Sequence, residues 1–341
     1  MRKEHVLKIK GSVEGDCLMK CLQEIFYWYG YPLEAFKLAG ITNCLNLQIL
    51  EEDIGKAASF FEIERINHKI INFKLIQGKN LEDSLKTLFE VIDSDNLLIA
   101  LLNTYHLYYT EDYHKLSGGL FKSYHSVIIN GYDLEKQVIL VTDLNEMQTS
   151  IEVNIEEFGL EWTYTKDATY FEPLKYVVCS RVENPANYCD IMLDSLKYSV
   201  NMYLSDMKKA QESTENLQNI FALQKIMSDV INDMYEEKQR VDILNNIVYS
   251  IFHFIRWSCK SRGYFFDFDE FKEVYDFSEI VPQMHDLFDD WTLVYNLLNI
   301  SIVGNNENRL KSAFMHMNET IEKGNAIVKG IANIMYGNKS L

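Results

Sequence analysis

Three residues in the first half of the sequence have side chains that can together carry out nucleophilic chemistry, namely Cys17, His125 and Asp143. Cys17 opens an amphipathic stretch, so we expect it in the first turn of a helix, with Asp16 as the N-cap. The partial positive charge at a helix N-terminus lowers the pKa of a thiol and favours the nucleophilic thiolate. The alternative is a buried structural cysteine, since free cysteine is among the most buried residue types.

His125 stands directly before one strand-like run, residues 126–132, and Asp143 ends the next run, residues 137–143. A short turn joins the two runs, so we expect an antiparallel hairpin with His125 and Asp143 at the same end. A carboxylate beside a histidine fixes its tautomer and stabilises the imidazolium, and cysteine acyl-transfer enzymes pair such a histidine with a thiol. The pattern therefore predicts a Cys17–His125–Asp143 site. A surface histidine and a turn-opening aspartate are the alternatives.

Four further residues close to these three in the sequence are candidates for binding a substrate. Asn145 lies two residues beyond the aspartate and on the same face, where it either contacts substrate or orients the histidine itself. Tyr124 directly precedes the histidine, and Tyr105 and His106 belong to a tyrosine-rich segment that we expect to line a substrate site or to lie on the surface. A metal site needs three or four converging ligands, which this spacing does not supply, so we expect no metal and no cofactor.

The elements that hold these residues follow from the hydrophobic periodicity. Apolar residues recur at helical spacing in three stretches, residues 17–29, 50–61 and 81–93. Short apolar or alternating runs, which are typical of strands, cover residues 5–10, 96–103, 126–132, 137–143 and 174–180. A few helices mixed with strands that short turns connect predict an α+β domain over residues 1–183.

The sequence changes character near Pro185, and we place a domain boundary between residues 183 and 190. Residues 190–341 carry long patterns of helical period without a repeat of fixed length, which predicts an all-α helical bundle. Its predicted helices span residues 191–211, 217–238, 241–262, 268–277, 284–303 and 307–336. The junction has no flexible Gly/Ser run, so we expect the helical domain to pack near the active-site rim of the first domain.

The composition excludes several classes of protein. Of the 341 residues 47% are hydrophobic, and 50 acidic against 33 basic residues give a formal charge of −17. This charge argues against nucleic acid and against an anionic membrane surface as partners, and it suits a cationic, amine-bearing small molecule. The sequence has no apolar run of membrane-spanning length, no signal-peptide pattern and only six cysteines. We therefore expect a cytoplasmic protein with reduced thiols, and the abundant Lys, Asn, Ile and Tyr are typical of an AT-rich bacterial genome.

Two blocks of the sequence resemble a known family. The block GDCLMKCLQEIFYWYGYPL is similar to the opening of the N-terminal domain of the butirosin biosynthesis protein H family, which has a cysteine, an amphipathic helix and a Tyr-Gly pair. The blocks NLLIALLNTYHLYY and HSVIINGYDLEKQVILVTD resemble its second part, in which an apolar strand leads to an aromatic loop, a His-strand-GYD segment and a strand that ends in Asp. The resemblance extends over residues 8–180.

The resemblance implies a papain-like fold, related to that of bacteriocin-processing cysteine peptidases, and an acyltransferase of secondary metabolism. Such an enzyme moves an acyl group from a carrier-protein thioester to an amine, so an acyl carrier protein and an amine-bearing small molecule are the implied partners. Cys17 matches the nucleophile, His125 the base and Asp143 the residue that orients the histidine. No glutamine precedes the cysteine, so we expect an oxyanion hole made by backbone N–H groups at the helix start.

Two other functions fit the same residues. One is a cysteine peptidase or amidase, in which water instead of an amine takes the acyl group from Cys17. The other is a non-catalytic binding protein of the same fold, in which Cys17 is buried and unreactive. The partition of an acyl-enzyme between water and amines separates transfer from hydrolysis, and the reactivity of Cys17 separates both from binding.

Overall fold

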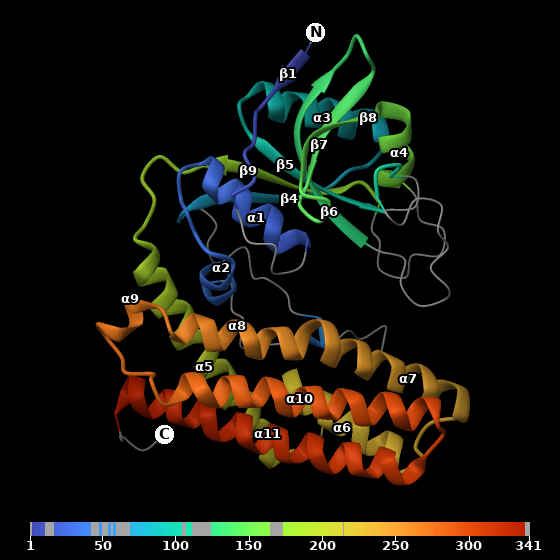
Figure 1. The fold of residues 1–341 in the computed structure, drawn as a ribbon, viewed down its shortest axis with the longest axis vertical. Helices are drawn as coiled ribbons and strands as arrows, with labels where there is room; N and C mark the ends of the chain where they lie inside the picture. Colours follow the sequence, from blue (N-terminus) through green and yellow to red (C-terminus); the bar gives the residue numbers. More distant parts are fainter. Residues whose placement is uncertain are drawn as a thin grey trace. The chain divides into compact units, whose positions relative to one another are not determined.

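The computed structural model describes residues 2–10, 17–41, 48–49, 54–55, 57–58, 69–103, 107–110, 124–163, 173–213 and 215–337. Contacts within the chain divide it into two compact units. The first unit comprises Met1–Leu38 and Ile66–Ala186, and the second comprises Ala39–Arg65 and Asn187–Leu341. The first contains the main β-sheet and the second contains the long helices, so the architecture is α+β (Figure 1).

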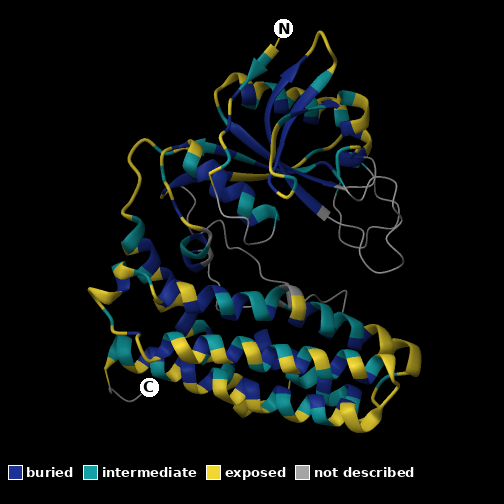
Figure 2. Ribbon diagram, in the orientation of Figure 1, coloured by how far each residue is buried: buried dark blue, intermediate teal, exposed yellow. Residues whose placement is uncertain are grey.

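The first unit is built on a seven-stranded sheet in which paired strands are antiparallel. The strand order is β4-β9-β5-β6-β7-β8, and β1 pairs with the end of β6. The strands are β1 (Arg2–Glu4), β4 (Ile71–Gln77), β5 (Leu97–Asn103), β6 (Tyr124–Asp133), β7 (Val138–Asp143), β8 (Gln148–Asn154) and β9 (Lys175–Arg181). Figure 2 shows the central strands buried, as their runs of Val, Ile and Leu require.

Helices cover both faces of this sheet. α3 (Leu81–Asp93) and α4 (Ile155–Thr163) pack on one face, into which every second strand residue points. The core on that face includes Leu88, Ile92, Leu98, Ala100, Val127, Ile129, Phe158 and Trp162. α1 (Cys17–Trp28) packs on the other face, where the ring of Phe26 contacts the ring of Phe73 in β4. The sheet is thus held between helices, and the start of α1 lies near β6.

The sequence of α1 explains where this helix begins and ends. Its buried apolar residues recur at helical spacing, at Met19, Cys21, Leu22, Ile25 and Phe26. The helix is followed by Gly30, whose φ of +88° favours glycine, and the Tyr31 N–H donates back to the Phe26 carbonyl oxygen over 2.8 Å. The helix predicted over residues 17–29 is therefore confirmed to within one residue. The predicted N-cap, Asp16, lies outside the described residues, and a short helix α2 (Ala35–Ile41) follows α1.

β6 and β7 form the hairpin that the sequence predicts between the histidine and the aspartate. Ile128 pairs with Thr142, and the register shifts between Ile129 and Gly131. Gly131 lies where β1 approaches β6 closely, and a Cβ at this position would meet the Lys3 carbonyl oxygen at 2.5 Å. The Gly-Tyr-Asp segment of this strand therefore needs a residue without a side chain at its first position.

Five predicted elements of the first domain are confirmed with small shifts at their ends, namely those over residues 81–93, 96–103, 126–132, 137–143 and 174–180. Two predictions are wrong. In place of a helix over 50–61, the described residues there include β3 (Ala57–Ala58), which pairs with β2 (Gln48–Ile49). Residues 5–10 form no strand, because pairing with β6 already ends at Glu4. β4, β8 and α4 are not predicted, since polar residues interrupt their apolar patterns.

Long helices make up most of the second unit, and Figure 2 shows buried residues on the sides that face neighbouring helices. They are α5 (Tyr188–Glu212), α6 (Asn219–Ile231), α7 (Glu237–Ser250), a π-helical turn (Ile251–Ile255), α8 (Arg256–Phe266), α9 (Asp269–Lys272), α10 (Ile280–Val303) and α11 (Glu307–Tyr336). The prediction over 307–336 is confirmed at both ends, whereas the one over 241–262 is divided by the π-helical turn. In the part of the chain that the structure describes, none of the helices is long and apolar enough to cross a membrane.

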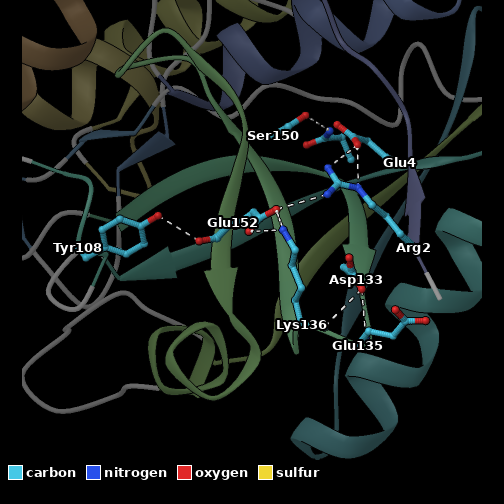
Figure 3. Close-up of polar contacts among 9 residues, drawn as sticks. Arg2, Glu4, Tyr108, Asp133, Glu135, Lys136, Ser150 and Glu152 are labelled. Carbon is cyan, nitrogen blue, oxygen red and sulfur yellow. Dashed lines mark hydrogen bonds and ion pairs between the residues drawn. The ribbon is translucent and has the colours of Figure 1, made fainter.

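A network of polar contacts fastens the short segment 107–110 to the sheet (Figure 3). The Tyr108 hydroxyl donates to the carbonyl oxygen of Glu152 in β8 over 3.0 Å. The Glu152 carboxylate accepts from Lys136 Nζ over 2.8 Å and from Arg2 over 3.4 Å. Exposed ion pairs of this kind contribute little to stability. The contact that holds the segment itself is the hydrogen bond from the Tyr108 hydroxyl to the backbone of β8.

Candidate active site

His125 and Asp143 lie at the same end of the β6–β7 hairpin and form a direct hydrogen bond. His125 Nε2 donates to Asp143 Oδ2 over 2.7 Å. Both residues are buried, with exposed fractions of 5% and 0%. Antiparallel pairing brings the start of β6 next to the end of β7, which explains the contact. The predicted adjacency of these two side chains is confirmed.

The other oxygen of the Asp143 carboxylate is held by the turn that follows β7. The backbone N–H groups of Asn145 and Glu146 donate to Oδ1 over 2.9 Å and 3.3 Å. Burial acts to raise the pKa of Asp143, but the hydrogen bond and charge of His125 and these two N–H groups outweigh it and hold that pKa below its ordinary value. The carboxylate is therefore ionised, and it keeps a proton on Nε2 of His125.

Cys17 is the first residue of α1, and two sulfur contacts fasten this helix to the strand that carries the histidine. The Ser126 N–H donates to Cys17 Sγ over 3.3 Å. One turn further along α1, the thiol of Cys21 donates to the Ser126 carbonyl oxygen over 3.3 Å. Cys21 is fully buried and holds the helix in place, whereas Cys17 is partly exposed. The nucleophile predicted from the sequence therefore lies at the end of a rigid element, next to residue 126.

The thiol of Cys17 interacts directly with the imidazole of His125. Burial is the largest influence on the pKa of His125 and acts to lower it, because a charged ring loses its hydration. The hydrogen bonds and charges of Asp143 and Cys17 together outweigh burial and raise this pKa to about 10. Since Nε2 is bonded to Asp143, Nδ1 is the nitrogen that can receive the thiol proton. The arrangement favours a thiolate–imidazolium pair.

Asn145 lies close to the histidine ring, and Lys20 contacts Asn145. Asn145 Nδ2 lies 3.5 Å from His125 Nδ1, and Asn145 Oδ1 accepts from Lys20 Nζ over 2.9 Å. The sequence left open whether Asn145 orients the histidine or contacts substrate, and the structure assigns the orienting hydrogen bond to Asp143. Lys20 was not predicted as a site residue. Its position three residues after Cys17, on the same face of α1, is the one sequence signal that points to it.

Tyr109 brings a buried hydroxyl close to Asp143. Burial is the main cause that raises the pKa of Tyr109, and the negative charge of Asp143 raises it further, so the phenol stays protonated. The sequence analysis singled out this tyrosine-rich segment but named Tyr105 and His106, which lie outside the described residues. Tyr124 begins β6 directly before the histidine. The spacing of residues in the sequence does not indicate that Tyr109 lies close to Asp143.

The second unit contains a cavity of about 30 Å³ between its helices. Its lining includes Tyr203, Asn219, Cys259 and Arg262, and Arg262 is only 8% exposed. Among the described residues that line it there is no histidine, so the Cys259 thiol has no general base there. Within the described ranges, no three His, Cys, Asp or Glu side chains gather as a metal site.

Comparison with known proteins adds no family to these observations. No family model matches the chain, and no curated protein matches it. The chemistry of the chain is therefore argued from the geometry of its site.

Proposed function

We propose that the chain is a cysteine-dependent acyltransferase with a papain-like catalytic domain, which moves an acyl group from a thioester to an amine through an acyl-enzyme on Cys17. The observation that carries this proposal is the 2.7 Å hydrogen bond between His125 and Asp143 next to the thiol. A nucleophile, a base and a group that orients the base are the parts that covalent acyl transfer needs. The resemblance of residues 8–180 to the butirosin biosynthesis protein H family supports transfer in cytoplasmic secondary metabolism over hydrolysis.

In the first half-reaction, His125 Nδ1 holds the thiol proton and the Cys17 thiolate attacks the carbonyl carbon of the donor. The oxyanion that forms accepts hydrogen bonds from backbone N–H groups in the first turn of α1, which have no acceptor within the helix. The tetrahedral intermediate collapses with loss of the C–S bond of the donor, and the leaving thiolate takes the proton from Nδ1. The products are S-acylated Cys17 and the free donor thiol.

In the second half-reaction, neutral His125 accepts a proton from the acceptor amine while the amine nitrogen attacks the acyl carbon. The new intermediate collapses with loss of the bond to Cys17 Sγ and releases an amide. The proton remains on Nδ1, which restores the thiolate–imidazolium pair. Water in place of the amine gives a carboxylic acid, and this is the reaction of the peptidase or amidase alternative.

We propose an acyl carrier protein as the natural donor. The chemistry does not require the carrier itself, because the scission takes place at the thioester. A formal charge of −17 disfavours an acidic carrier except at a local basic surface, so a small thioester tests the catalytic step without the docking step.

Intact-protein mass spectrometry after incubation with N-acetylcysteamine thioesters tests the proposal. We expect one acyl adduct, mapped to Cys17, that disappears in Cys17→Ser and persists in Cys21→Ser. An added amine should discharge the adduct as an amide faster than water discharges it as an acid. Discharge to the acid alone would identify a hydrolase, and a wild-type protein that acquires no adduct at Cys17 would overturn the enzymatic assignment.

A further inference from the structure

The proposed mechanism assigns the acceptor amine to one place in the first unit. The amine must give its proton to His125 Nδ1, so its nitrogen lies within hydrogen-bonding distance of that atom during attack. Asn145 Nδ2 lies 3.5 Å from the same nitrogen. The groups next to the amine in the acceptor molecule therefore meet Asn145 and whatever surrounds it.

Lys20 supplies a positive charge at that place. Its ammonium donates to the neutral amide oxygen of Asn145 over 2.9 Å, and within the described ranges no carboxylate lies at ion-pair distance from it. Other lysines of the first unit do pair with carboxylates, as Lys3 does with Asp95 and Lys136 with Glu152. In a chain with a formal charge of −17, Lys20 is thus a cation that contacts the neighbour of His125 and is available to a ligand.

The contact with Lys20 also fixes the orientation of the Asn145 amide. Because Oδ1 accepts from Lys20, the amide nitrogen lies on the side of His125, 3.5 Å from Nδ1. An ammonium and an amide NH2 side by side are two hydrogen-bond donors, one of them charged, and that set suits a carboxylate. A polycationic amine would meet the positive charge of Lys20, which repels it.

We infer that Lys20 and Asn145 form an acceptor subsite that selects amines carrying a carboxylate a few atoms from the nitrogen, that is, short amino acids. This inference rests on the proposed function and names the acceptor class of the same site. It differs from the expectation drawn from net charge, which pointed to a cationic acceptor. The net charge of a chain does not determine the local charge at a site, and this site contains a lysine.

The experiment measures how fast the preformed acyl-enzyme reacts with three sets of amines at equal concentrations of free base. The sets are glycine, β-alanine and 4-aminobutanoate; the uncharged matches glycinamide and β-alaninamide; and the dication former 1,2-diaminoethane. A partly exposed ion pair and its charge-assisted hydrogen bond predict that the best amino acid reacts about tenfold faster than its amide. Lys20→Met should bring that ratio close to one, and Lys20→Glu should favour the diamine.

A matched control is Lys86→Met in α3, where the lysine side chain is 76% exposed and pairs with Glu90. This variant should keep the preference of the wild type. The acylation half-reaction of every variant is followed with two thioesters, one with a neutral and one with an anionic leaving thiol. If Lys20→Met slows acylation by the anionic donor alone, the charge recognises the donor and the acceptor assignment is wrong.

The outcomes separate the inference from the function on which it rests. A wild-type protein without any adduct at Cys17 would overturn the proposed function, and the subsite with it. An acyl-enzyme that reacts equally with amino acids and their amides, or that prefers amino acids equally in Lys20→Met, would overturn the subsite and leave the transferase intact. An adduct that only water discharges would remove the acceptor altogether.

Discussion

Two buried residues of the sheet unit and two of the helical unit have pKa values that are shifted towards opposite charge states. In the sheet unit, the pKa of His125 is raised and that of Asp143 is lowered, so both are shifted towards their charged forms although burial opposes this. In the helical unit, burial is the main cause that raises the pKa of Asp206 and of Tyr203, so both are shifted towards their neutral forms. A pKa shift that opposes the effect of burial requires charged or hydrogen-bonding partners next to the group. A pKa shift in the direction that burial favours requires no such partners.

The partners differ in origin as well as in effect. His125 and Asp143 come from two strands, and the thiol that completes the group comes from a helix on the sheet. Asp206 has its nearest cation, Lys209, on its own helix at 3.7 Å, and that lysine is 59% exposed. The Asp206 pair thus lies within one helix, whereas the group at the end of the β6–β7 hairpin is assembled from two strands and a helix.

The largest effect that this comparison predicts is at the thiol. Cys17→Ala should lower acyl-transfer turnover by at least about 10⁴-fold, because no other group in the site replaces the nucleophile. Cys21→Ala, which removes a fully buried thiol from the same helix, should lower stability and keep most of the turnover of the folded protein. Turnover that survives in Cys17→Ala would show that Cys17 is not the nucleophile.

A chain that ends at Ala186 tests whether the sheet unit folds without the helices. In the whole chain, Asn246 and Ser250 of α7 donate to the carbonyl oxygens of Ile54 and Gly55, each over 3.1 Å. The carbonyl oxygens of Ile54 and Gly55 therefore lose these hydrogen-bond donors when the helices are removed. We expect this shortened chain to be poorly soluble and to lose transfer, as measured by solubility, circular dichroism and amide formation. A folded fragment with undiminished transfer would show that the helices are an independent module.

Asp143→Asn should lower turnover by about 10²–10³-fold while leaving the fold intact, because the amide no longer holds His125 in the reactive tautomer. Near-ultraviolet circular dichroism and thermal unfolding report on the fold, and Asp95→Asn is the control. Asp95 is exposed and pairs with Lys3, so its loss should leave turnover unchanged. A similar loss of turnover in both variants would mean that Asp143 acts only through stability.

The smallest predicted effect is on the pH dependence of stability in the helical unit, where Asp206 acts in the direction opposite to Asp143. The raised pKa of Asp206 means that its contribution to stability is present at low pH and is lost as pH rises through that pKa. Asp206→Asn should therefore change the free energy of unfolding at neutral pH by less than about 1 kcal/mol. It should also reduce the decrease in that free energy above pH 4, as measured by urea unfolding. For Asp143, whose pKa is lowered, the contribution is instead lost as pH falls. A large loss of stability at neutral pH in Asp206→Asn would show that the two carboxylates behave alike.

Local patterns in the sequence predict the elements that are strongly periodic. The helix over 307–336 is confirmed at both ends because its apolar residues keep helical spacing throughout. The stretch 50–61 has similar spacing, yet Gly55 takes a φ of +86° and the flanking residues form two short strands. Their contacts with α6 and α7 override the local preference, and no local pattern reveals contacts of that range.

In the candidate site, too, some contacts can be predicted from local sequence and others depend on tertiary structure. The pairing of His125 with Asp143 is predictable because 18 residues and one hairpin separate them, and side-chain alternation settles the rest. Lys20 and Asn145 are 125 residues apart, and their meeting depends on how α1 packs on the sheet. The position of Tyr109 beside Asp143 depends on the tertiary fold in the same manner. Sequence patterns thus identify the reacting groups, while their surroundings emerge only from tertiary structure.

The direct test of the central claim is the pH dependence of Cys17 alkylation by iodoacetamide, in wild type and in His125→Ala. His125 stays protonated until the pH rises through its pKa of about 10, so at neutral pH the imidazole carries a positive charge beside the sulfur of Cys17 and should promote alkylation there. At pH 6.5 we expect the wild type to react at least about tenfold faster than the variant, which should follow an ordinary thiol profile. Superimposable profiles would contradict the account, because Cys17 and His125 would then not form an ion pair.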